Sequence, residues 1–281
     1  RRQGLPAELR MPKLEDMSAT NKTYFGVDWV RSDIRVTTDA GQTPIAPGKM
    51  VSDVTRGDRR TAHFVSGAPI LNFFSIQSAD YKIATRNHNG VQSTVFYHPD
   101  HAWNVDKMLR AMGASLDYYR ANFGPYQFDF ARIIEFPGYQ SFAQAFAGTM
   151  PYSESIGFNA NTNDPEKIDF TSYVIAHELA HQYWAHQVVG ADQQGNTLTS
   201  ETLAQYSALM VMRKLYGPDQ IRRFLKYELD NYLSGRKGEA TEELPLVRVE
   251  NQGYIHYRKG AVVMYLLQEQ LGEARVNAAL R

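Results

Sequence analysis

Two histidines and a glutamate form the densest group of chemically active residue types in the sequence. His177, Glu178 and His181 make the pattern HExxH within residues 173–181, a segment that reads as a helix. Residues four apart lie on one face of a helix, one turn apart, so the two imidazoles can bind a single cation. Glu178 is next to the first histidine and can reach a water molecule on that cation. The pattern is therefore typical of metal-dependent hydrolysis, with Glu178 as the general base.

A third ligand is needed, because a catalytic zinc takes three protein ligands and leaves its fourth position to water. The sequence contains no cysteine, so this ligand must be a His, Asp or Glu residue. Glu201 stands at the start of a segment whose apolar spacing predicts a buried helix. It would complete a His2Glu site, a ligand set that suits zinc and other divalent transition metals.

Each of these residues also has a purely structural interpretation. The two histidines could be ordinary polar positions on a helix, and Glu201 alone could be an exposed glutamate favoured by the helix dipole. Their combination favours the metal site. His186 lies nine positions after His177, half a turn out of phase on a helix. We expect it to face away from the metal as a structural histidine.

The spacing resembles that of the M1 aminopeptidases, in which HExxH is followed by eighteen residues and then by a glutamate ligand. Here residues 182–200 make nineteen intervening positions, and Ser200-Glu201-Thr202 stands in place of the usual Asn-Glu-Gly. The local sequence looks most like the M1 domains fused to bacterial ABC-2-type permease proteins. The resemblance covers about residues 99–271 and implies one Zn²⁺ per chain, held by His177, His181 and Glu201.

Two further residues are implicated by this resemblance. Tyr257 opens a segment that resembles the family's Tyr-x-Lys-Gly element, which implies that it donates a hydrogen bond to the oxyanion during hydrolysis. Glu154 stands near the place of the family's Gly-x-Met-Glu-Asn motif, whose glutamate pairs with the free α-amine of the substrate. Tyr257 could instead be a half-buried tyrosine at the start of a helix, with Tyr254 as its competitor, and Glu154 could be a plain carboxylate on an edge strand.

The elements that must position these residues fall into two parts. Residues 22–98 carry short apolar runs separated by Gly, Pro, Asn and Asp, which predict part of a β-sandwich. After Pro99, apolar residues spaced by three and four predict a helix of about 20 residues that ends at Gly124-Pro125. Strands are expected at Phe128–Phe136 and Ser155–Phe158, and the chain from Ile168 onward is predicted to be mainly helical, with a break at Gly272.

The predicted fold class is therefore α+β. Residues 1–98 are expected to form a β-rich region, the C-terminal part of an N-terminal β domain. Residues 99–281 are expected to form a thermolysin-like catalytic domain that is truncated at its C-terminal end.

The composition limits the classes of partner that the protein can be expected to bind. Lys and Arg number 30, against 30 for Asp and Glu, so no overall charge favours nucleic acid or an anionic membrane surface. No run approaches the roughly 20 apolar residues that a membrane-spanning helix needs. We expect a soluble domain that acts on peptides; the resemblance implies attachment to a bacterial membrane permease polypeptide. The side of the membrane and the oligomeric state are left open.

The predicted function is zinc-dependent hydrolysis of peptide bonds, with removal of N-terminal amino acids as the first hypothesis. A thermolysin-type endopeptidase would share every metal residue but need no amine anchor. A weakly active or inactive peptide-binding regulatory module of a permease is the third alternative, although such a module has no need for Glu178.

Overall fold

The computed structural model describes residues 3–4, 10–240 and 242–281. Strands fill the first half of the chain: β1 (Trp29–Val30), β2 (Asp33–Asp39), β3 (Thr43–Ile45), β4 (Lys49–Arg56), β5 (Arg59–Val65), β6 (Ile70–Leu71), β7 (Gln77–Ala79), β8 (Lys82–His88), β9 (Val91–Tyr97), β10 (Phe130–Phe136) and β11 (Thr149–Ser153). The α-helices are α1 (Val105–Asn122), α2 (Phe170–Ala180), α3 (Leu203–Tyr216), α4 (Pro218–Gly238), α5 (Gly260–Leu271) and α6 (Glu273–Leu280). Short 3₁₀ turns lie at Met17–Asn21 and Leu246–Arg248, and π-helical turns at Leu198–Thr202 and Tyr254–Lys259.

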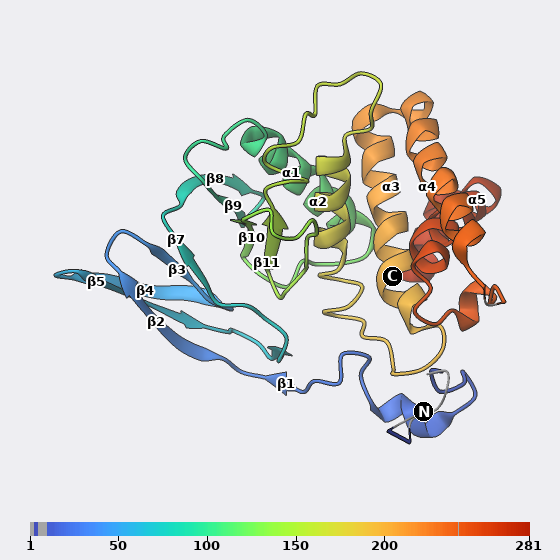
Figure 1. Cartoon of the computed structure of the whole chain (residues 1–281), viewed down its shortest axis with the longest axis horizontal. Coiled ribbons are helices and arrows are strands. Elements are labelled where there is room, and N and C mark those ends of the chain that lie inside the picture. Colours follow the sequence, from blue (N-terminus) through green and yellow to red (C-terminus); the bar gives the residue numbers. More distant parts are fainter. Residues whose placement is uncertain (1–2, 5–9, 241) are drawn as a thin grey trace.

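The N-terminal region is β-rich, as the sequence predicts. An antiparallel sheet of order β2-β5-β4 projects from the rest of the molecule, and two-stranded pairs β1-β6 and β3-β7 lie beside it (Figure 1). Its small apolar core is formed by Ala46, Ala62 and Phe64. Every residue of β4 is exposed, so this sheet buries little on its outer side.

A second sheet packs against α1 and contributes to the main hydrophobic core. Its strand order is β11-β10-β9-β8, with β11, β10 and β9 mutually parallel and β8 antiparallel to β9. The helix α1 connects the parallel strands β9 and β10, as such a crossover requires. Because β8 and β9 precede residue 98, this sheet runs across the expected boundary between residues 98 and 99.

The strand expected at Ser155–Phe158 is wrong. The strand is β11 at Thr149–Ser153, and residues 154–158 form turns. Pro151 lies inside β11 and is tolerated because β11 is the edge strand of its sheet. Its carbonyl accepts a hydrogen bond from the Gln144 amide at 3.0 Å. The segment 143–146 thereby runs antiparallel along the outer side of β11.

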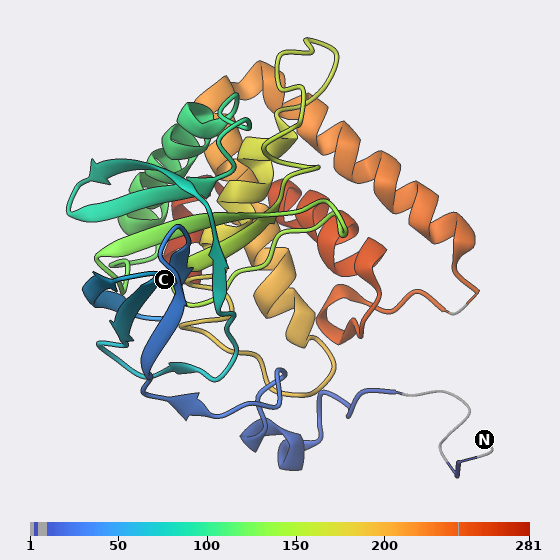
Figure 2. The ribbon, with the colours of Figure 1, turned by 60° about the vertical axis from the view of Figure 1, so that its left-hand side comes forward.

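The helices follow one another across the molecule, away from the sheet (Figures 1 and 2). The predicted helix after Pro99 is confirmed as α1, with Met108, Met112 and Leu116 fully buried against the sheet and α2. The predominance of helix from Ile168 onward and the break at Gly272, where φ is 88°, are also confirmed. Among the described residues, no helix has both the length and the apolar character needed to cross a membrane.

Candidate metal centre

The two histidines of the HExxH pattern lie at the end of α2. Asp169 caps the start of this helix, because its carboxylate accepts a hydrogen bond from the Ser172 amide at 3.0 Å. The helix is buried on nearly all sides and ends at Ala180. His177 and His181 are 8% and 6% exposed, and their ring centroids lie 4.5 Å apart. The i, i+4 spacing therefore brings both imidazoles to one point, as the sequence predicts.

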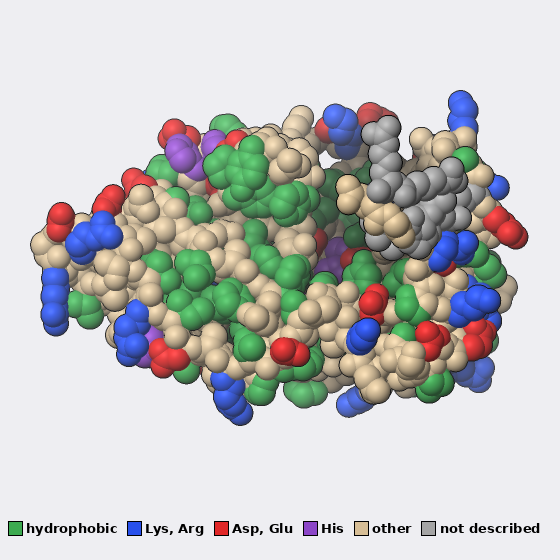
Figure 3. All heavy atoms as spheres, turned by 60° about the horizontal axis from the view of Figure 1, so that its bottom comes forward, with side chains coloured by type: hydrophobic (Ala, Val, Ile, Leu, Met, Phe, Trp, Pro, Cys, Tyr) green, Lys and Arg blue, Asp and Glu red, His purple; other side chains and the backbone are tan. Residues whose placement is uncertain are grey.

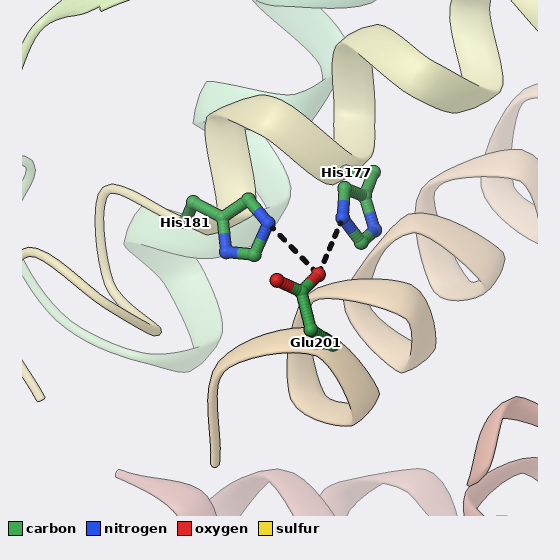
Figure 4. Close-up of side chains that lie close together, drawn as sticks. All are labelled: His177, His181 and Glu201. Atoms are coloured by element: carbon green, nitrogen blue, oxygen red, sulfur yellow. Dashed lines mark ion pairs between the residues drawn. The ribbon is translucent and has the colours of Figure 1, made fainter. Parts of the chain in front are cut away.

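Glu201 approaches the same point from the π-helical turn that precedes α3. Its Oε2 atom lies 3.3 Å from Nε2 of His177 and 3.3 Å from Nε2 of His181 (Figure 4). Zinc bonds of about 2.0–2.1 Å in a tetrahedral site place neighbouring ligand atoms roughly 3.3–3.4 Å apart. Oε2 is buried and has no hydrogen-bond partner among the described residues. The donor set and its spacing thus fit a tetrahedral metal ion.

The imidazole of His181 is oriented by a hydrogen bond on the side away from Glu201. Nδ1 of His181 donates to the backbone carbonyl of Trp184 at 3.0 Å, which leaves Nε2 free to face Glu201. Nδ1 of His177 is buried without a hydrogen-bond partner in the described part of the chain. On the side away from Glu201, the His177 imidazole is therefore held by packing.

The charges of the site favour a cation. Burial disfavours ionisation of Glu201, but the two histidines outweigh burial and hold its pKa well below the usual value. Burial likewise opposes a charge on His181, yet the Glu201 carboxylate raises its pKa to about 9. Positive charge is thus stabilised between these three side chains, and a divalent ion can supply it in place of a proton.

Glu178 has the environment of a general base. It is 7% exposed, and burial raises its pKa, although the neighbouring histidines act in the opposite direction. The backbone N–H of Ala145, from the segment beside β11, donates to its carboxylate. A carboxylate with a raised pKa accepts a proton from water more readily than a free glutamate does.

Tyr257 faces the centre from the second π-helical turn. Its ring centroid is 5.8 Å from that of His177. Burial and the charge of Glu201 raise the pKa of its phenol, so Tyr257 keeps its proton and can donate it. Tyr254 instead stacks on Tyr232, with ring centroids 6.1 Å apart.

A pocket opens beside this centre. His177, Glu178 and Tyr257 line a cavity of about 190 Å³, with Phe142 and Ala143 from the segment beside β11 on another wall. Histidine and acidic side chains are visible at the bottom of a hollow near the middle of the molecule (Figure 3). Glu178, the phenol of Tyr257 and the candidate metal ligand His177 therefore share one accessible space.

A buried polar network that the sequence analysis did not predict borders this pocket. Glu228 is completely buried and accepts hydrogen bonds from Tyr173 at 2.9 Å, Gln205 at 2.9 Å and Arg258 at 3.1 Å. Arg258 is next to Tyr257, so this network anchors the turn that carries the phenol. In the sequence, only the position of Arg258 next to Tyr257 could have indicated this network. Its partner Glu228 lies 30 positions before Arg258.

His186 occupies the place of a structural histidine. Its Nε2 lies 3.1 Å from the carbonyl of Ala145, and burial lowers its pKa to about 4. Helical phase does not set its direction, because α2 ends at Ala180 and the chain turns at Ala185, where φ is 149°.

Glu154 is not brought together with the other predicted site residues. It follows β11, and its Oε1 accepts a hydrogen bond from the Gly138 amide at 2.8 Å. Its Oε2 lies 3.8 Å from Nδ1 of His101, which pairs directly with the buried Glu135. These three side chains place potential ligand atoms within 4.8 Å of one another, but the direct contact of His101 with Glu135 is that of an ion pair.

The position of Glu154 does not support the predicted contact with a substrate amine. Glu154 is absent from the residues that line the pocket beside Glu178. The segment that borders this pocket is 141–143, which precedes β11 in the sequence and runs antiparallel to it.

Comparison with known proteins agrees with this geometry. Residues 103–281 match the model of the peptidase family M1 domain. Over 200 residues the chain is 27% identical to human endoplasmic reticulum aminopeptidase 2, which covers 68% of this chain and 21% of that protein.

Solved structures of similar fold include an M1 zinc metallopeptidase from Deinococcus radiodurans, with 21% identity and a TM-score of 0.62. A variant of that enzyme bound to a Tyr-Ser-Ala substrate gives a TM-score of 0.63 at 21% identity. Both matches cover 90% of this chain and 56% of the solved chain. The chain thus spans about half the length of these solved relatives and a fifth of the human protein.

Proposed function

We propose that this chain, which belongs to peptidase family M1, is a zinc metallopeptidase and removes N-terminal amino acids from peptides. The observation that carries the proposal is the convergence of His177, His181 and Glu201 beside a pocket that Glu178 and Tyr257 share. One Zn²⁺ per chain is proposed from the ligand spacing and from the zinc metallopeptidases of similar fold.

The chemistry divides between the metal and the side chains. When bound, zinc supplies a Lewis acid that polarises a carbonyl and lowers the pKa of a water ligand to about 7. Glu178 accepts the proton of the attacking water, and its raised pKa favours this transfer. It then carries the proton to the leaving amine, so it acts first as a base and then as an acid.

The phenol of Tyr257 completes the arrangement. It keeps its proton because burial and Glu201 raise its pKa. It can therefore donate a hydrogen bond to the oxygen that becomes negative when the scissile carbonyl is attacked. The network of Glu228 and Arg258 holds this turn in place without entering the reaction.

A second candidate function is endopeptidase activity of thermolysin type. It is favoured by one observation, namely that Glu154 does not line the pocket and so offers no carboxylate there to a substrate amine. A regulatory peptide-binding module is less favoured, since the buried Glu178 would have no role in it.

Membrane attachment is proposed from sequence resemblance alone. The segments around HExxH and Glu201 look most like M1 domains fused to bacterial permeases, and we propose that this domain forms part of such a polypeptide. Detection of the protein in the membrane fraction of its native cells would test the proposal; recovery only in the soluble fraction would contradict it.

The activity is tested with a panel of aminoacyl fluorogenic amides, supplied with a free and with an N-acetylated amine, on the zinc-loaded chain and on Glu178→Gln. Glu178-dependent cleavage of free-amine substrates alone would support an aminopeptidase. Cleavage of both sets would support the endopeptidase. Absence of cleavage by a chain that carries stoichiometric zinc would contradict both.

A further inference from the structure

A second cavity lies between the two sheets and shares no lining residue with the pocket of the metal centre. It has a volume of about 280 Å³ and is bounded by β4 and β5 on one side and by β8, β9 and β10 on the other. The two sheets lie next to each other in the ribbon (Figure 1). Its walls are largely apolar, with Phe64, Phe96 and Phe130 contributing aromatic rings.

A buried arginine borders this cavity. Arg132 lies on β10 and is 7% exposed. Thr94 on β9 is directly opposite Arg132 in the sheet register, and Thr85 on β8 is opposite Thr94. All three line the cavity, so the guanidinium extends from a row of cross-strand neighbours that forms its floor.

Among the residues that the structure describes, none offers a carboxylate partner to the charge of Arg132. Within the part of the chain that the structure describes, its hydrogen bond is from Nη2 to the carbonyl of Gly48 at 2.7 Å, and its Nε is buried with no partner. The guanidinium otherwise lies over the rings of Phe130, 4.4 Å from the centroid, and Phe64, 5.8 Å from it. A buried arginine normally has a carboxylate or phosphate for its planar set of donors.

The guanidinium is charged at neutral pH. Burial lowers the pKa of Arg132, but only to about 10. The other charged groups on the cavity walls do not neutralise it. Lys49 pairs with Asp129 at the rim, and Arg60 pairs with Asp53 at 2.6 Å. A net positive charge therefore remains at the floor of an apolar cavity.

We propose that this cavity binds a small organic monocarboxylate with an apolar body, whose carboxylate pairs with the guanidinium of Arg132. The aromatic walls accommodate the apolar body, and a single unpaired guanidinium accounts for a single carboxylate. Free amino acids fit poorly, because their ammonium group would lie close to the unpaired charge of Arg132 and beside apolar walls.

The test is isothermal titration of the zinc-loaded chain with octanoate and 3-phenylpropionate, each compared with its neutral amide. We expect the carboxylates to bind and the amides to bind at least about tenfold more weakly, because the amide lacks the charge that pairs with the guanidinium. Glu178→Gln should bind the carboxylates as the unchanged chain does, because the two cavities are separate.

Substitutions at the cavity separate the role of Arg132 from mere apolar binding. Arg132→Met should abolish carboxylate binding, and Thr94→Phe should block it by filling the floor. Lys49→Met is the matched control, because it removes a rim charge that Asp129 already neutralises, and it should weaken binding less than about threefold. Zinc content and peptidase activity report whether each variant is folded.

If Arg132→Met does not fold, Arg132→Lys tests the role of the guanidinium instead, since this variant keeps the charge and loses the planar set of donors. It should weaken the carboxylates by about tenfold. Three results would overturn the proposal: no binding of either carboxylate up to about 10 mM, equal binding of acids and amides, or unchanged binding by a folded Arg132 variant.

Discussion

Substitution of Gly260 by alanine should disturb the metal centre from a distance. A Cβ atom at this position would lie 2.5 Å from Oγ1, 2.7 Å from Cγ2 and 3.1 Å from Cβ of Thr202. Thr202 follows the ligand Glu201, and its hydroxyl donates to the carbonyl of His256 at 2.6 Å. Gly260 therefore allows the turn that carries Glu201 and the turn that carries Tyr257 to lie against each other.

The magnitude follows from these contacts. Three atoms of one buried side chain must move by up to about an ångström, and overpacking of this kind costs typically 1–3 kcal/mol. Because Thr202 is bonded to Glu201, the same movement displaces a ligand atom that lies 3.3 Å from both imidazoles. We expect Gly260→Ala to lose about 2 kcal/mol of stability, to bind zinc more weakly and to lose at least about tenfold in kcat/KM.

A double-mutant cycle tests whether the clash with Thr202 causes the loss of stability in Gly260→Ala. Thr202→Ala removes two of the three clashing atoms and, by itself, should cost about 1 kcal/mol through loss of its hydrogen bond to His256. Gly260→Ala combined with Thr202→Ala should cost less than the sum of the two by about 1 kcal/mol or more. Urea unfolding, zinc content and peptidase kinetics would be measured for all four proteins. Strict additivity in stability, or a Gly260→Ala chain with normal zinc affinity and activity, would refute the reasoning.

Three further substitutions test the assigned roles. Tyr257→Phe should keep zinc and lower kcat by roughly 10²–10³, equivalent to about 2.7–4 kcal/mol, whereas Tyr254→Phe should change kcat little; equal effects in steady-state kinetics would contradict the assignment. Glu178→Gln should retain stoichiometric zinc by atomic absorption while turnover falls to background, and an active variant would remove Glu178 as the base. Glu154→Gln should leave kcat/KM for free-amine substrates within about threefold, because its partners lie outside the pocket; a large, selective loss on these substrates would restore the amine-binding role that the sequence predicts.

The convergence of His177, His181 and Glu201 could be predicted because most of the sequence signals for it are local. His177 and His181 are fixed relative to each other by one helical turn, and Asp169 gives α2 a recognisable start. The remaining ligand needed one further assumption, that the next buried helix packs against α2. That assumption holds because α2 and α3 contribute to the same core, with Ile175, Leu179 and Leu209 among its fully buried residues.

The position of Glu154 relative to the pocket could not be predicted from the sequence, because it depends on contacts between strands. Two consecutive extended segments, 143–146 and β11, precede the turns that lead toward α2. The sequence does not show which of the two segments borders the pocket, since either could form the edge of the sheet. The hydrogen bond from the Gln144 amide to the Pro151 carbonyl puts the segment 143–146 on the outer side of β11, and Glu154 then lies beside Gly138. For the same reason the sequence did not predict that β8 and β9 belong to one sheet with β10 and β11. The pairing of β10 with β9 joins strands that are separated in the sequence by the whole of α1.

The additional residue between HExxH and Glu201 has a structural explanation. In the turn Leu198–Thr202 the amide of Leu203 donates to the carbonyl of Leu198, five residues earlier, which is the hydrogen bond of a π-helix. Such a turn accommodates one residue more than an α-helical turn while the helix continues beyond it. Glu201 can therefore face the histidines across nineteen intervening residues without a change in α3. The turn that carries Tyr257 has the same form, because the amide of Gly260 donates to the carbonyl of Ile255. Both side chains that complete the centre thus project from π-helical turns packed against each other, and the close approach at Gly260 and Thr202 makes their positions interdependent.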